Sequence, residues 1–332
     1  MRSVEPGLVD GRPPKGRQPH SSVGLTDATL ELYLSQMPQD QTVADILKKV
    51  QRIQIVANRA VNDIFAGQYK SVFRGRGMEF DEVREYQPGD DIRSIDWNVT
   101  ARSDNCFIKR YCEERELTVM FLVDVSASGA FGSTQQSKLE LVVEVAALLM
   151  FSALKNNDKV GLIKFCDDVI EYLPPRKGKS HVLHIIRQLV DAQPIARETN
   201  LTNALDFLNR VQKRRSVVFL ISDFIGPSAR HALAVSNKRH DLTAITISDP
   251  REQALPDVGF ISLMDAETGE IVEVDTRQQA VRAMFESAAS GGRAELTQEL
   301  KKVGADELPI NTEEDYLVSL RRFFAMREKR FR

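Results

Sequence analysis

The chain alternates continuous apolar runs with segments whose apolar residues recur every three or four positions. Two apolar runs, 117–125 (LTVMFLVDV) and 216–222 (SVVFLIS), predict strands that are covered on both faces. Shorter apolar runs predict strands at 159–165 and 242–247, and 169–173 is a candidate to pair with the first of these. Strands that alternate with helices at this spacing predict a mostly parallel sheet flanked by helices, in an α/β three-layer fold.

Helical periodicity separates and follows these strands. The spacing predicts helices over residues 138–154, 180–189, 201–211, 229–238, 278–303 and 313–330. We expect the helix over 278–303 to break at Gly291 and Gly292, because glycine is a poor helix former. A hairpin is predicted over 260–274, with its turn at 267–269.

The first third of the chain has a different character. Residues 1–42 are rich in proline and glycine at their start and predict a disordered or weakly structured segment, with a weak helix at 25–37. Residues 43–116 combine an amphipathic helix over 43–65 with a charged, glycine-rich element that contains a strand at 107–111. Its single tryptophan, Trp97, is expected to be a core anchor. The remaining residues, 117–332, form the main predicted domain.

Composition limits the function classes. The 332 residues are 42% hydrophobic and 28% charged, with a formal net charge of −2, which is typical of a soluble globular protein without a general attraction to nucleic acid. Cys106, Cys112 and Cys166 lack zinc-binding spacing and are expected to be reduced thiols. No segment has the roughly 20 apolar residues of a membrane span, and the N-terminus lacks a signal-peptide core. We therefore expect a cytoplasmic protein without an integral membrane segment.

Oxygen-bearing side chains gather in three loops at the predicted carboxyl edge of the sheet. The loops are 124–128 (DVSAS), 198–201 (ETNL) and 222–224 (SDF), and ligands of open α/β sheets bind at this edge. Carboxylates and hydroxyls are the donors that Mg²⁺ prefers, whereas DxSxS by itself is as consistent with a helix N-cap. The candidate ligands are Asp124, Ser126, Ser128, Thr199 and Asp223. They are too few to fill an octahedral shell, so a position stays open for water or a partner.

Together, the three loops resemble the metal-ion-dependent adhesion site of von Willebrand factor A domains. The segment RGRGMEFDEVREYQPGDDIRSIDWNVTARS, followed by KRYCEE and FLVDVSAS, is similar to the signature of the bacterial family called domain of unknown function 58. The resemblance covers roughly residues 45–250. By position it implies the same five metal ligands, with Thr202 as a rival to Thr199.

The resemblance also implies a partner class. Such proteins are often encoded beside MoxR-type AAA+ ATPases, and similar A domains act as substrate adaptors for them. Many members of the family carry transmembrane helices before the signature. Because no such helix precedes it here, this chain is interpreted as a soluble member.

These observations predict a metal-dependent protein-binding module and not an enzyme. Its Mg²⁺, with Mn²⁺ and Ca²⁺ as alternatives, would accept a carboxylate oxygen from an acidic residue of the partner. An alternative is a phosphoryl-transfer enzyme with Asp124 as nucleophile, although Ser126 occupies the place of the second aspartate that such enzymes usually carry. A weaker alternative is nucleic-acid binding through basic terminal segments.

A second candidate surface is the charged element before the sheet. Its arginines and acids are interpreted equally well as surface ion pairs or as a partner-docking face. The candidate docking residues are Arg74, Arg76, Glu79, Arg84 and Arg93.

Overall fold

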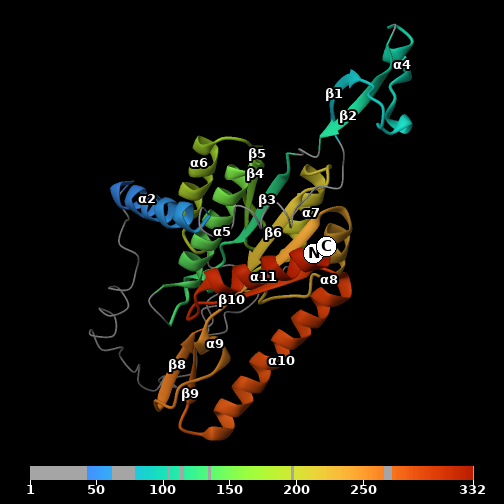
Figure 1. The fold of residues 1–332 in the computed structure, drawn as a ribbon. Helices are drawn as coiled ribbons and strands as arrows, with labels where there is room; N and C mark the ends of the chain where they lie inside the picture. Colours follow the sequence, from blue (N-terminus) through green and yellow to red (C-terminus); the bar gives the residue numbers. More distant parts are fainter. Residues whose placement is uncertain are drawn as a thin grey trace, which may run out of the picture. The chain divides into compact units, whose positions relative to one another are not determined.

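The centre of the computed structural model is a six-stranded sheet with the order β10-β7-β6-β3-β4-β5 (Figure 1). The strands are β3 (Thr118–Asp124), β4 (Lys159–Phe165), β5 (Val169–Arg176), β6 (Val217–Ser222), β7 (Asp241–Ser248) and β10 (Asp306–Asn311). Neighbouring strands run parallel except for β4 and β5, which pair antiparallel. The structure describes residues 43–61, 79–103, 105–112, 116–133, 136–195, 198–264 and 271–331. The predicted α/β fold with a mostly parallel sheet is confirmed.

Two layers of helices cover the sheet (Figure 1). One apolar core joins the sheet to α2 (Val43–Ala60), α5 (Lys138–Lys155), α6 (Lys179–Val190) and α11 (Tyr316–Phe331). The core on the other face joins it to α7 (Leu201–Val211), α8 (Arg230–Arg239) and α10 (Gln279–Val303). Because both faces are covered, every residue of β6 is buried, as its unbroken apolar run predicts.

Two smaller sheets are antiparallel hairpins. The first pairs β1 (Glu79–Glu85) with β2 (Phe107–Cys112), which confirms the strand predicted at 107–111. The second pairs β8 (Phe260–Met264) with β9 (Ile271–Asp275), while the turn expected at 267–269 lies outside the described residues.

Trp97 corrects one prediction. It is 67% exposed and is not a core anchor. Trp97 begins the four-residue helix α4 (Trp97–Thr100), whose N-cap is the buried Asp96. A hairpin of two strands offers little apolar surface in which to bury an indole ring, since only one neighbouring strand flanks each backbone.

One further expectation fails at two glycines, and one strand that contains a proline was not predicted. Helix α10 continues through Gly291 and Gly292 without a break. Each exposed glycine costs a helix only about 1 kcal/mol relative to alanine, and the flanking turns offset that cost. Strand β10 was not anticipated, because Pro309 interrupts its short alternation of apolar residues. Proline is tolerated there because β10 lies at the edge of the sheet.

The N-terminal predictions are tested only in part. The amphipathic helix expected over 43–65 is present as α2, which ends at Ala60. The disorder expected within residues 1–42 and the weak helix at 25–37 fall outside the described residues. In the part of the chain that the structure describes, no helix combines the length and apolarity needed to cross a bilayer.

Candidate functional site

The three predicted loops lie at the point where the strand order of the sheet reverses. After β3 the chain continues to β4 and β5 on one side, then returns to place β6 on the other side of β3. The loops that follow β3 and β6 therefore diverge at their carboxyl ends and leave the crevice where α/β sheets bind ligands. Asp124 is the last residue of β3, and Ser222 is the last residue of β6.

The Asp124 carboxylate accepts hydrogen bonds from all three loops of the site. Its Oδ1 accepts a hydrogen bond from the backbone N–H of Ser126 at 3.0 Å. Its Oδ2 accepts from Ser222 Oγ at 2.6 Å and from Thr199 Oγ1 at 3.1 Å. All four residues are buried, so their hydrogen bonds fix the carboxylate in one orientation. Ser222 was not among the predicted ligands, although a serine that ends a buried strand beside Asp223 was a signal for it.

Backbone hydrogen bonds bring Thr199 to Asp124. Ile195 N donates to Val125 O at 3.0 Å, and Ile195 also forms an isolated parallel bridge with Ser126. Asn200 N donates to Cys166 O at 2.8 Å just before α7 begins. The rival Thr202 is exposed on α7, so the structure brings Thr199 and not Thr202 to the carboxylate.

The two serines of the motif face one another. Ser126 Oγ lies 2.9 Å from Ser128 Oγ, where the short helix η3 (Ala127–Ala130) begins. Ser126, Ser128, Asp124 and Asp223 line a cavity of about 20 Å³. That volume holds roughly one water-sized sphere, which is also the scale of a single metal ion.

Asp223 approaches the cavity from the loop after β6. Its Oδ1 accepts from Ile225 N at 3.1 Å. The next residue, Phe224, has φ 58°, a left-handed conformation that costs a non-glycine residue about 1 kcal/mol or more. Its N–H donates to Ser222 Oγ at 2.9 Å. The loop is thus held in a strained turn that keeps Asp223 at the cavity.

A buried lysine that the sequence did not single out completes the cluster. Lys138 Nζ lies 2.8 Å from Asp223 Oδ2 and 2.5 Å from Glu252 Oε1, and the lysine side chain is only 2% exposed. Burial opposes its charge, but Asp223 and Glu252 outweigh that effect and raise the pKa of Lys138 above its usual value. The ammonium therefore stays charged beside the predicted metal ligands.

The site concentrates negative charge in a poorly solvated place. Burial, followed by the nearby charge of Asp223, raises the pKa of Asp124. A cation between the two carboxylates would offset both effects. Within the described residues, no three His, Cys, Asp or Glu side chains cluster to hold a metal, so Ser126, Ser128 and Thr199 would have to supply part of the shell. Hydroxyl and carboxylate oxygens fit a hard cation such as Mg²⁺.

The second predicted surface is only partly described. Arg74 and Arg76 lie outside the described residues, and Glu79 begins β1. Arg84 forms a two-pronged ion pair with Asp90, at 2.9 and 2.7 Å, across the turn that contains Gly89. Arg93 is exposed on the short helix η2 (Ile92–Ser94). Arg84 therefore stabilises its own hairpin.

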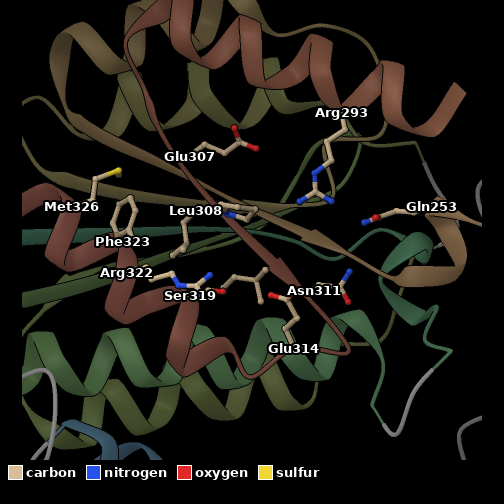
Figure 2. Close-up of a pocket in the computed structure, with 12 residues that line it drawn as sticks. Gln253, Arg293, Glu307, Leu308, Asn311, Glu314, Ser319, Arg322, Phe323 and Met326 are labelled. Carbon is tan, nitrogen blue, oxygen red and sulfur yellow. The ribbon is translucent and has the colours of Figure 1, made fainter. Parts of the chain in front are cut away.

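A larger groove of about 530 Å³ lies along the edge strand β10. Figure 2 shows Arg293 of α10 and Arg322 of α11 on either side of this strand. Glu307 and Glu314 also line the groove, so its charge is mixed. No predicted site residue lies there.

Comparison with known proteins gives the same family that the signature suggests. The family described as protein of unknown function DUF58 matches residues 82–295. The uncharacterized protein Rv1480 of Mycobacterium tuberculosis is 32% identical over 280 residues, which cover 83% of this chain and 88% of that protein. The uncharacterized protein YeaD of Bacillus subtilis is 32% identical over 120 residues, or 35% of this chain and 28% of that protein.

Two solved structures that match the chain have low sequence identity. The conserved hypothetical protein BatB from Bacteroides thetaiotaomicron is 18% identical with a TM-score of 0.43, covering 64% of this chain and 99% of that one. The SpRpn10 VWA domain is 10% identical with a TM-score of 0.35, covering 62% of this chain and 94% of that one.

Proposed function

The chain belongs to the DUF58 family, and from that premise we propose that it is a metal-dependent protein-binding module. The observation that supports this most is the convergence of oxygen donors from three separate loops on the switch point of the sheet. In this proposal the bound cation is Mg²⁺. The residues that hold it are Asp124, Ser126, Ser128, Thr199 and Asp223.

The open coordination position is where the partner binds. The small cavity at Asp124 leaves room for one ion and does not enclose a second molecule. A carboxylate from an Asp or Glu of another protein would complete the shell from outside, since Mg²⁺ prefers oxygen donors. Without the ion, the net negative charge of the site would repel that carboxylate. Binding is therefore expected to depend on the metal.

The hydrogen bonds of Asp124 favour binding over phosphoryl transfer. Both of its carboxylate oxygens accept hydrogen bonds, Oδ2 from two hydroxyls at once. An in-line attack on phosphorus needs a carboxylate oxygen that faces the substrate, and Ser126 stands where such enzymes usually carry their second aspartate. Asp124 instead has the contacts of a group that orients a metal shell. We propose that Asp124 has a binding role and is not a phosphoryl nucleophile.

The partner we propose to test first is a MoxR-type AAA+ ATPase. This choice rests on the family resemblance of the sequence. The chemistry of the site adds one requirement, which is an acidic residue on the binding surface of the ATPase. The protein would then act as an adaptor or partner of the ATPase in protein maturation or complex assembly.

The experiment that tests the proposal compares the wild type with Asp124→Ala. We expect the wild type to bind Mg²⁺ in isothermal titration calorimetry and to retain the ATPase of its own organism in a pull-down that chelator abolishes. Asp124→Ala is expected to lose both, while Asp206→Ala, which removes an exposed aspartate of α7, keeps both. Normal Mg²⁺ affinity in Asp124→Ala would refute the assignment.

A further inference from the structure

Lys138 lies at a position where two physical effects, the helix dipole and burial, disfavour a positive charge. It is the first residue of α5, directly after the N-cap Ser137, and the positive end of the helix dipole repels a cation there. It is also almost fully buried, and a buried ammonium requires compensating charge. Violations of local preference concentrate at functional sites. The compensation comes from Asp223 and Glu252, and Asp223 is itself a proposed metal ligand.

The two carboxylates that hold Lys138 differ in their surroundings. Glu252 lies on the four-residue helix α9 (Pro250–Gln253), where its Oε2 accepts from the N-cap Asp249 N at 3.0 Å. The capping box thus fixes Glu252 and leaves Oε1 to the lysine at 2.5 Å. Asp223 instead lies on the strained loop after β6 and lines the small cavity. Glu252 can keep Lys138 by itself, whereas Asp223 has a second cationic partner available in the proposed ion.

The charges of the cluster match a divalent ion. When all are ionised, Asp124, Asp223 and Glu252 outnumber Lys138 by two negative charges. One Mg²⁺ would balance them, with the Lys138–Glu252 pair neutral within itself. A monovalent ion would leave the buried cluster charged, which is costly.

We propose that Lys138 is a tethered cation that competes with the divalent ion for Asp223 and so sets the metal affinity of the site. Without metal, the ammonium neutralises Asp223 and prevents repulsion between the two buried aspartates. With metal, Asp223 turns to the ion and Lys138 stays with Glu252 alone. The inference rests on the metal site of the proposed function and adds a residue that determines its affinity.

The two substitutions Lys138→Met and Glu252→Gln have opposite expected effects. Lys138→Met removes the competitor, so Mg²⁺ affinity measured by calorimetry is expected to rise by about tenfold. Glu252→Gln removes the alternative partner of the lysine, which then binds Asp223 more tightly, and Mg²⁺ affinity is expected to fall by about tenfold. Arg251→Met is the control, because it removes a positive charge from an exposed position on α9, next to Glu252 in the sequence. It should leave the Mg²⁺ affinity near that of the wild type.

The melting temperature supplies a second measurement. In chelator, Lys138→Met is expected to melt below the wild type, since Asp223 loses its ion-pair partner in a site where its side chain is only 6% exposed. Mg²⁺ should then raise the melting temperature of Lys138→Met more than that of the wild type. If Lys138→Met does not fold, Glu252→Gln still tests the inference, because it keeps the lysine.

The outcomes separate this inference from the proposed function. If the wild type binds Mg²⁺ but Lys138→Met binds it equally or more weakly, or Glu252→Gln binds it no more weakly, the competition is refuted and the metal site stands. If only Lys138→Met binds Mg²⁺, the tethered cation stands and the metal dependence of the natural protein is refuted. If no variant binds Mg²⁺, the metal site is refuted, and the competition with it.

Discussion

Ser222 and Asp124 join the carboxyl ends of the two central strands, with Ser222 Oγ donating to Asp124 Oδ2 at 2.6 Å. The same hydroxyl accepts from Phe224 N at 2.9 Å, in the turn that carries Asp223. One serine therefore links both aspartates of the candidate site. Ser222 belongs to the loop 222–224 by which the site was predicted, but it was not among the five predicted ligands.

Replacing Ser222 with alanine tests this link. The change leaves a buried carboxylate oxygen with one donor fewer, so the free energy of unfolding is expected to fall by about 1–3 kcal/mol. Mg²⁺ affinity should fall as well, because Asp124 and the Asp223 loop lose their shared anchor. Chemical denaturation and calorimetry measure the two effects, and Ser287→Ala, at an exposed position on α10, is the control. Wild-type stability and affinity in Ser222→Ala would show that the bond is incidental.

Gly226 sets the distance between the Asp223 and Thr199 loops. Its φ is 139°, and a Cβ at this position would lie 3.0 Å from the carbonyl oxygen of Thr199. Gly226→Ala is expected to lower the free energy of unfolding by about 1 kcal/mol or more and to weaken Mg²⁺ binding, because the loop of Thr199 must move.

Gly259→Ala is the matched control for that substitution. Gly259 also has a positive φ, 94°, but no atom lies within 4 Å of its added Cβ. It should show the cost of backbone strain in denaturation without any change in Mg²⁺ affinity. Equal Mg²⁺ affinities in Gly226→Ala and the wild type would contradict the role given to the close approach.

The low pKa of His240 predicts that the folded protein loses stability in mild acid. Burial, together with the charges of Arg239 and Arg215, lowers the pKa of His240 to about 4. The unfolded chain therefore takes up the proton first, since its histidine titrates near pH 6.5. Stability is fully present above that pH and is lost as the pH falls from about 6.5 towards 4, by about 3 kcal/mol at most.

The measurement is urea denaturation between pH 4 and 7. We expect His240→Asn to flatten the dependence of the unfolding free energy on pH in this window. His231→Asn, at an exposed histidine of α8, should keep the wild-type slope. A wild-type slope in His240→Asn would assign the acid sensitivity to other groups.

Trp97 gives a test of the charged hairpin without any substitution. It is the single tryptophan of the chain and is 67% exposed. Its fluorescence in the native protein is expected to resemble that of a solvated indole and to be quenched by acrylamide nearly as strongly as in urea. Strong protection from acrylamide in the isolated protein would contradict the exposed position of Trp97.

The fold was largely predictable because its information is local. The apolar runs of β3 and β6 indicate strands that are buried on both faces, and the periodicity of α7 indicates a helix that is buried on one face. Prediction failed where local preference and context disagree. Pro309 hid the edge strand β10, and Gly291 and Gly292 suggested a break in a helix that continues.

The candidate site, like the fold, could be predicted from the sequence only in part. The sequence alone placed Asp124, Thr199 and Asp223 after buried strands or before a helix, and parallel strands bring such ends to one edge. Only the tertiary structure placed Ser222 against Asp124, 98 residues away, and Lys138 against Asp223, 85 residues away. The reason is physical: periodicity reports whether a side chain is buried, whereas strand order and loop conformation decide which charges and hydrogen-bond partners it meets.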